Sequence, residues 1–89
     1  MRAIVTVIGK DQVGIIAAVC ATLSAHDVNV LDISQTVLQD YFTMIMLVDV
    51  SRSDLPFAEL AEVLEAEGEG KGMSIRIQRE DIFNAMHRI

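Results

Sequence analysis

Hydrophobic positions recur at strand spacing and at helix spacing in alternate parts of the chain. Residues 2–9 (RAIVTVIG) are apolar and β-branched and end at a glycine, which is typical of a strand covered on both faces. Residues 14–27 place apolar side chains three and four positions apart, which predicts an amphipathic helix. The stripe expected to face the core consists of Ile16, Val19, Cys20 and Leu23.

The middle and the end of the chain return to strand-like patterns. Residues 29–50 contain two apolar runs that meet near Asp40, which predicts a β-hairpin. Residues 73–79 (MSIRIQR) alternate apolar and polar side chains, as a strand with one solvated face does. Residues 80–89 carry apolar side chains at helical spacing and predict a short C-terminal helix.

A second helix is predicted between the hairpin and the last strand. Ser53 or Asp54 is the expected cap, and Pro56 falls in the first turn, where its missing N–H costs nothing. Gly68 is expected to end this helix, which leaves residues 68–72 (GEGKG) as a flexible turn. The inward-facing positions are Phe57, Leu60, Ala61 and Leu64.

The order of these elements is βαββαβ, which predicts an α+β fold of the ferredoxin-like type. Residues 1–80 form the predicted domain, and residues 81–89 form a C-terminal helical extension. The side chains expected to face the helices are Ala3, Val5, Val7, Phe42, Met44, Met46 and Val48. The opposite face, here called the open face, has an apolar centre of Ile4, Ile8, Ile45 and Leu47. Its polar rim comprises Asp32, Ser34, Thr36, Ser74, Arg76 and Gln78. Either a second subunit or the C-terminal tail is expected to cover it.

Composition adds constraints on partners and location. A domain of 89 residues buries only about 60 to 65% of its unfolded surface, yet 52% of the residues are hydrophobic and the mean hydropathy is +0.40. Part of that apolar surface is therefore expected to meet another subunit. The net charge of −6 opposes direct binding to nucleic acid. The sequence shows neither a secretory signal nor a membrane span, so we expect a cytoplasmic protein.

The turn GKDQVGII, residues 9–16, has two interpretations. In the first, Asp11 caps the following helix, and Gly14 permits close packing without any ligand. In the second, Gly14 leaves the amides of Ile15 and Ile16 open to a carboxylate or another small anion. The residues of the turn alone do not decide between them.

Several activities of ferredoxin-like domains are disfavoured by the residues of the chain. RNA-binding modules need basic character and aromatic side chains exposed on the central strands. Metallochaperones need paired cysteines, whereas this chain has only Cys20. A hydrolase of the acylphosphatase type needs an arginine in the first loop, where only Lys10 is present. We therefore expect no catalytic residues, no metal and no cofactor.

The same turn and the start of the hairpin resemble an ACT domain. The family pattern is an acidic residue, a variable position, usually proline, then glycine and two aliphatic residues, with an asparagine about a dozen residues later. The matching residues are Asp11, Gln12, Val13, Gly14, Ile15 and Ile16, with Val13 in place of the proline, and Asn29 for the asparagine. The resemblance covers residues 1–80 and is nearest to small stand-alone ACT proteins and to one half of the glycine cleavage system transcriptional repressor.

The resemblance implies a regulatory role. It places an amino-acid-like ligand at a homodimer interface, held by residues 11–16 together with Asn29 and Val30. It also implies a regulated enzyme or transcription factor as a further partner. The alternative is a pure protein-interaction module that docks on such a partner and binds no small molecule.

Overall fold

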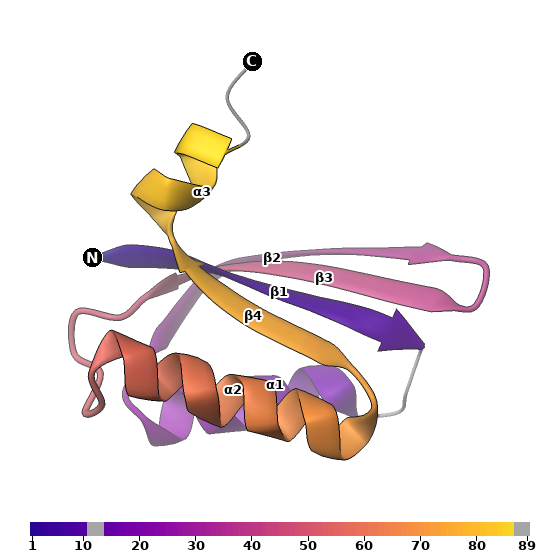
Figure 1. Cartoon of the computed structure of the whole chain (residues 1–89), viewed down its shortest axis with the longest axis horizontal. Coiled ribbons are helices and arrows are strands. Elements are labelled where there is room, and N and C mark those ends of the chain that lie inside the picture. Colours follow the sequence, from indigo (N-terminus) through magenta and orange to yellow (C-terminus); the bar gives the residue numbers. More distant parts are fainter. Residues whose placement is uncertain (11–13, 87–89) are drawn as a thin grey trace.

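The computed structural model describes residues 1–10 and 14–86 and contains one four-stranded antiparallel sheet with two helices packed on it (Figure 1). The elements are β1 (Arg2–Lys10), α1 (Ile15–Ala25), β2 (Asn29–Leu38), β3 (Tyr41–Asp49), α2 (Phe57–Lys71), β4 (Ser74–Arg79) and α3 (Glu80–Met86). The strand order β2-β3-β1-β4 places β1 and β3 at the centre of the sheet. The predicted ferredoxin-like βαββαβ arrangement is therefore confirmed.

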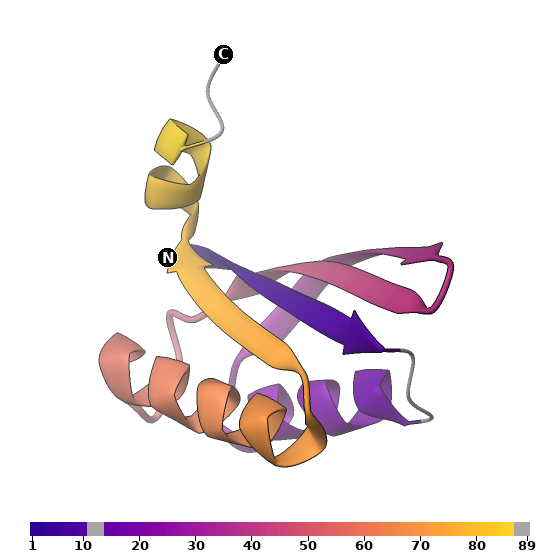
Figure 2. The same cartoon turned by 45° about the vertical axis from the view of Figure 1, so that its right-hand side comes forward.

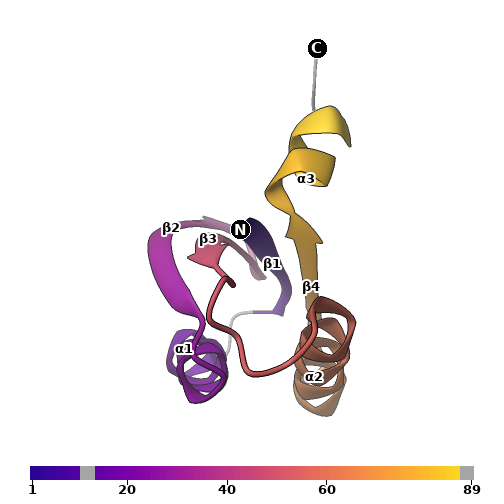
Figure 3. The same cartoon turned by 90° about the vertical axis from the view of Figure 1, so that its left-hand side faces the viewer.

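The hydrophobic core lies between the sheet and the helices α1 and α2, which both cover the same face (Figure 3). All seven strand residues expected to face the helices are buried. In α1 the buried residues are Ile15, Val19 and Leu23, whereas Ile16 and Cys20 are only partly buried. The stripe is therefore rotated by part of a turn from the one predicted, because the helix begins with Ile15 packed on the core.

The hairpin turns where it was predicted. Strands β2 and β3 pair from Asn29↔Asp49 to Leu38↔Tyr41, and Gln39 and Asp40 form the turn between them. Gln39 has a φ of 54°, which is a conformation typical of tight hairpin turns. A β-bulge interrupts the pairing between Val30 and Asp32, so the alternation of faces along β2 shifts by one residue there.

Both predicted boundaries of α2 were wrong. Pro56 occupies the N-cap and gives no side-chain hydrogen bond, while the hydroxyl of Ser53 interacts with the backbone of Leu55. The helix then continues through Gly68 to Lys71, so residues 68–71 are helical rather than a flexible turn. It ends at Gly72, whose φ of 71° places it in the left-handed region that glycine favours.

The short helix α3 leaves the end of β4 and rises on the side of the sheet away from α1 and α2 (Figures 2 and 3). An ion pair joins Arg2 to Glu80 at 2.8 Å and ties the start of α3 to β1. Within residues 80–86 the helix leaves part of the open face uncovered: Ile8 and Ile45 remain 46% and 40% exposed, whereas Ile4 and Leu47 are half-buried. The described part of the tail therefore does not give this face the full cover that one prediction required.

Candidate functional site

The structure describes five of the eight residues predicted to bind a ligand. Asp11, Gln12 and Val13 lie outside the described residues, so the capping role predicted for Asp11 stays a prediction. Gly14, Ile15 and Ile16 start α1, whereas Asn29 and Val30 start β2. The two groups lie at opposite ends of α1 and face different hollows of the surface.

An apolar hollow of about 520 Å³ opens where α1 begins. Its walls come from the first turn of α1 and from the turn end of the hairpin, where β2 ends and β3 begins. The lining residues are Gly14, Ile15, Ile16, Ala17, Gln35, Val37 and Phe42. Most of these side chains are apolar, and Gln35 is the exception on the strand side. The hollow therefore suits an apolar group placed beside a helix N-terminus.

Gly14 gives this hollow access to the backbone of α1. Its φ of 83° lies in the left-handed region, and apart from its chain neighbours no heavy atom of the described residues lies within 4 Å of the position that a Cβ would occupy. Glycine is needed here for its backbone conformation, while the space beside it is open. Because Gly14 has no side chain, it contributes no cap of its own to the amides of the first turn.

A polar groove lies at the other end of β2. Two adjoining hollows of about 470 and 360 Å³ share Asp27, Asn29 and Arg52. The remaining lining residues are Ser24, Val28, Asp49 and Ser51. Over residues 1–10 and 14–86, the Arg52 guanidinium has neither a hydrogen bond nor an ion pair. The groove thus offers an unpaired cation, two carboxylates and an amide within one surface.

Local hydrogen bonds set the charge of this groove. The side-chain and backbone hydrogen bonds from Ser51 hold the pKa of the Asp49 carboxyl below its ordinary value, and the N-terminal amine adds a smaller effect. The backbone N–H of Ser51 donates to Asp49 Oδ1 at 2.9 Å. Asp49 therefore stays ionised at neutral pH. Asp27 has a φ of 60°, a conformation that aspartate tolerates better than most residues.

The hollow and the groove cannot hold one small ligand within a single chain. Asn29 begins β2, whereas Gln35 and Val37 lie near its end. Each residue of a strand advances about 3.3 Å, so the six steps from Asn29 to Gln35 span roughly 20 Å. An amino acid is much shorter than this distance. Any site that uses both Gly14 and Asn29 needs a second copy of the chain.

The strand that joins the two features is an exposed edge. Residues 31–37 of β2 are all exposed, and Leu31, Ile33 and Val37 are among the large hydrophobic residues with 40% or more of their surface accessible. Asp32 is the only charged residue in the strand. Long apolar edges of this kind are normally paired, covered or interrupted by charge.

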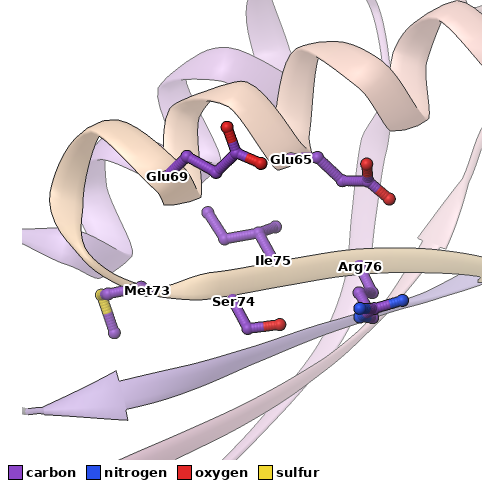
Figure 4. A pocket seen from close by; sticks show the side chains of 6 residues that line it. All are labelled: Glu65, Glu69, Met73, Ser74, Ile75 and Arg76. Carbon is purple, nitrogen blue, oxygen red and sulfur yellow. The ribbon is translucent and has the colours of Figure 1, made fainter.

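A third hollow, of about 210 Å³, lies along the opposite edge of the sheet, between α2 and β4. Glu65 and Glu69 extend from the helix, and Ile75 points from the strand toward it (Figure 4). Ser74 and Arg76 lie on the other side of the strand (Figure 4). None of the five described residues that were predicted to bind a ligand lines this hollow.

In the described part of the chain, no group of three or more histidine, cysteine, aspartate or glutamate residues could hold a metal ion. Likewise, none of the helices within residues 1–10 and 14–86 has the length and apolar character needed to cross a membrane.

The turn, the fold and the order of strands lead to one family. Residues 2–78 match the sequence profile of the ACT domain. The chain belongs to the ACT domain family. ACT domains are typically regulatory modules that bind ligands.

Individual relatives extend this result. A UPF0237 protein of Bifidobacterium longum is 54% identical over 88 residues, which cover 99% of this chain and 98% of the relative. An ACT domain protein from Streptococcus pneumoniae is 44% identical, with a TM-score of 0.82 and 98% of each chain covered. The structure described as a glycine cleavage system transcriptional repressor is 22% identical, with a TM-score of 0.70 over 86% of this chain and 44% of the other. This last likeness concerns the fold alone.

Sequence reasoning missed part of what surrounds the predicted site residues. Arg52 and Asp27 follow no motif in the sequence, and they reach the groove only because two loops meet beside the start of β2. Val37 and Phe42 could be assigned to the helix side from strand alternation, but their place beside Gly14 depends on where α1 begins.

Proposed function

We propose that this ACT domain is a non-catalytic cytoplasmic regulator that binds a small amino-acid-like ligand between two copies of the chain. One observation carries the proposal: the apolar hollow and the polar groove lie at opposite ends of the same unpaired edge strand. The hollow alone offers mainly apolar contacts, and the groove alone offers mainly charged and polar groups, whereas an amino acid with an apolar side chain needs both.

Pairing of two β2 strands would join these parts. A two-fold axis normal to the sheet makes the strands antiparallel, because an isologous contact exchanges the two directions. The Asn29 end of one copy then lies beside the Leu38 end of its partner. The polar groove of one copy thereby approaches the apolar hollow of the other, and the dimer has two equivalent sites.

The chemistry of the combined site fits a zwitterion with an apolar side chain. Arg52 and the amides after Gly14 can interact with a carboxylate, and Asp27 can accept from an ammonium group. The amide of Asn29 can both donate and accept. Ile16 and Val37 leave an apolar surface for the ligand's side chain. We therefore expect aliphatic or aromatic amino acids to bind in preference to charged ones.

A thermal-shift panel of the twenty amino acids tests this proposal. At 100 times the dissociation constant, a ligand stabilises the folded state by about 2.7 kcal/mol, which raises the melting temperature of a domain of this size by several degrees. Asn29→Ala should weaken binding about tenfold or more, because it removes hydrogen bonds to a polar ligand. Asn84→Ala, on the exposed surface of α3, is the matched control. The proposal fails if no amino acid at millimolar concentration shifts the melting temperature.

The second candidate function is a protein-interaction module. The same exposed β2 edge favours it, because a strand from an enzyme or transcription factor could extend the sheet there. Light scattering of a variant with charge on this edge, together with the thermal-shift panel, separates the two functions: this candidate predicts no amino-acid binding and a mass that Val37→Lys leaves unchanged, whereas the regulatory dimer predicts binding and a mass that Val37→Lys halves.

A further inference from the structure

The open face of the sheet is a second surface with the character of an interface. Its centre contains Ile4, Ile8, Ile45 and Leu47, which the strand register places in adjoining rows of β1 and β3. Ile8 is 46% exposed and Ile45 is 40% exposed. This face is separate from the β2 edge, since it lies on the broad surface opposite α1 and α2 (Figure 3).

The rim of the open face carries opposite charges at its two edges. Arg76 stands on β4 beside Thr6, and Asp32 stands on β2 beside Leu47. Figure 4 shows Arg76 on the side of β4 away from α2. Over the described ranges 1–10 and 14–86, the Arg76 side chain has no hydrogen bond or ion pair, and Asp32 accepts only from the adjacent backbone N–H of Ile33.

Two other charges on this face are already engaged: Arg2 pairs with Glu80, and Asp49 accepts from Ser51 beside the N-terminal amine. Lys10, at the end of β1, is exposed on the same face. Arg76 and Asp32 are the oppositely charged pair that can contact a partner without breaking an interaction within the described structure. They lie on opposite edge strands, with the apolar centre between them.

We propose that the open face packs against the open face of a second copy, with Arg76 of each copy paired to Asp32 of the other. A two-fold axis parallel to the strands places β4 of one copy over β2 of its partner. Arg76 and Asp32 occupy neighbouring rows of the sheet, two residues apart along the strands. That offset is about 7 Å, within the reach of an arginine side chain.

A second copy fits this face better than an unrelated partner. The apolar centre of one copy contacts the apolar centre of the other, and the Arg76 edge of each copy faces the Asp32 edge of its partner. The open face is therefore complementary to itself. Two sheets packed face to face lie about 10 Å apart, which the aliphatic side chains here can fill. A standard interface buries about 800 Å² per partner, which is about one seventh of the 5722 Å² surface of the chain.

The proposal predicts assembly beyond the β2-paired dimer. With both surfaces occupied, two such dimers stack and a particle contains four chains of 9.8 kDa each. Ile45 and Arg76 lie outside β2, so substitutions there disrupt the open-face contact separately from β2 pairing. The open-face contact does not require the ligand and can exist even if the proposed amino-acid site fails.

Light scattering of variants tests the open-face contact. Ile45→Lys and Arg76→Asp should each reduce the wild-type mass by half, while circular dichroism verifies that the sheet is retained. Asp32→Arg should have the same effect, and the double variant Arg76→Asp/Asp32→Arg should restore the wild-type mass. Glu62→Arg, exposed on the helix side, is the control for a reversed charge and should leave the mass unchanged.

Every result bears on the open-face contact. A wild-type protein of one chain overturns it, as does a wild-type mass that Ile45→Lys and Arg76→Asp both leave unaltered. A wild-type dimer that Ile45→Lys converts to single chains supports the open-face contact and contradicts β2 pairing. Failure of the double variant to recover the mass overturns the Arg76–Asp32 pairing.

Discussion

At the scale of single residues, two glycines of α2 have opposite relations to their surroundings. Gly68 is buried against β4: a Cβ there would lie 2.7 Å from the backbone oxygen of Met73 and 3.1 Å from the nitrogen of Ile75. Its carbonyl also accepts from the N–H of Met73 at 2.8 Å. Gly70 faces open space, with nothing within 4 Å of its Cβ position. Gly68 thus lets the helix pass close to the strand that follows it.

This contrast gives a matched pair of substitutions. Gly68→Ala should lower the free energy of unfolding by about 1–3 kcal/mol, because backbone atoms must move to admit the methyl group. Gly70→Ala should raise it by about 0.5–1 kcal/mol, because alanine loses less conformational entropy in a helix. Urea denaturation at equilibrium measures both. Equal effects of the two substitutions would contradict the close approach at Gly68.

At the scale of elements, a polar contact joins α1 and α2 beside the apolar core. The hydroxyl of Thr22 lies 2.5 Å from Glu67 Oε2 and 3.1 Å from the carbonyl oxygen of Ala18. The other carboxyl oxygen, Glu67 Oε1, is buried and has no hydrogen-bond partner among residues 1–10 and 14–86. A carboxylate with one unsatisfied oxygen costs free energy in the folded state.

A double-mutant cycle measures this contact. Glu67→Met should raise the free energy of unfolding by about 1 kcal/mol, because an apolar side chain of similar length removes the unsatisfied oxygen. Thr22→Val alone should lower it by about 1–2 kcal/mol, because the carboxylate then loses its donor. In the Glu67→Met background the same change should cost clearly less. Additive effects would show that the two side chains do not interact.

Strand faces could be predicted from the sequence, whereas the end of α2 and one residue of the polar groove could not. Strand alternation assigned the faces of β1 and β3, because a period of two admits only two phases. The end of α2 was misplaced at Gly68, because glycine inside a helix is read from the sequence as a stop, while the contact with Met73 arises only in the folded chain. Gly14 was proposed as a site residue from the turn itself and Asn29 from the resemblance, whereas no feature of the sequence indicated Arg52, because its position depends on how two loops meet.

At the scale of the whole molecule, the two edges of the sheet differ in how well they are protected from pairing with another strand. The β4 edge is short, carries Arg76 and Arg79, and runs directly into α3. The β2 edge has ten residues with one charge and exposed aliphatic side chains. Charge and short length protect a sheet edge from pairing, so the β2 edge is the one left available for a partner strand.

Charge introduced at the unprotected edge should therefore separate the chains that pair there. Val37→Lys is expected to halve the particle mass measured by light scattering, because the lysine would be brought against the apolar start of the partner's β2. Ala66→Lys, exposed on α2 and away from both proposed interfaces, is the control and should leave the mass unchanged. Equal masses for wild type and Val37→Lys would argue against β2 pairing.

The pairing of β1 with β4 has a consequence for how such a domain can be combined with others. Ala3 lies opposite Arg79 in the register, and Arg2 is tied to Glu80, so the strand that opens the fold and the strand that closes it meet at the same end of the sheet. A host protein could accept the whole unit at a single surface loop, since entry and exit are neighbours. The same neighbouring ends would allow two units to be linked in tandem by a short connection.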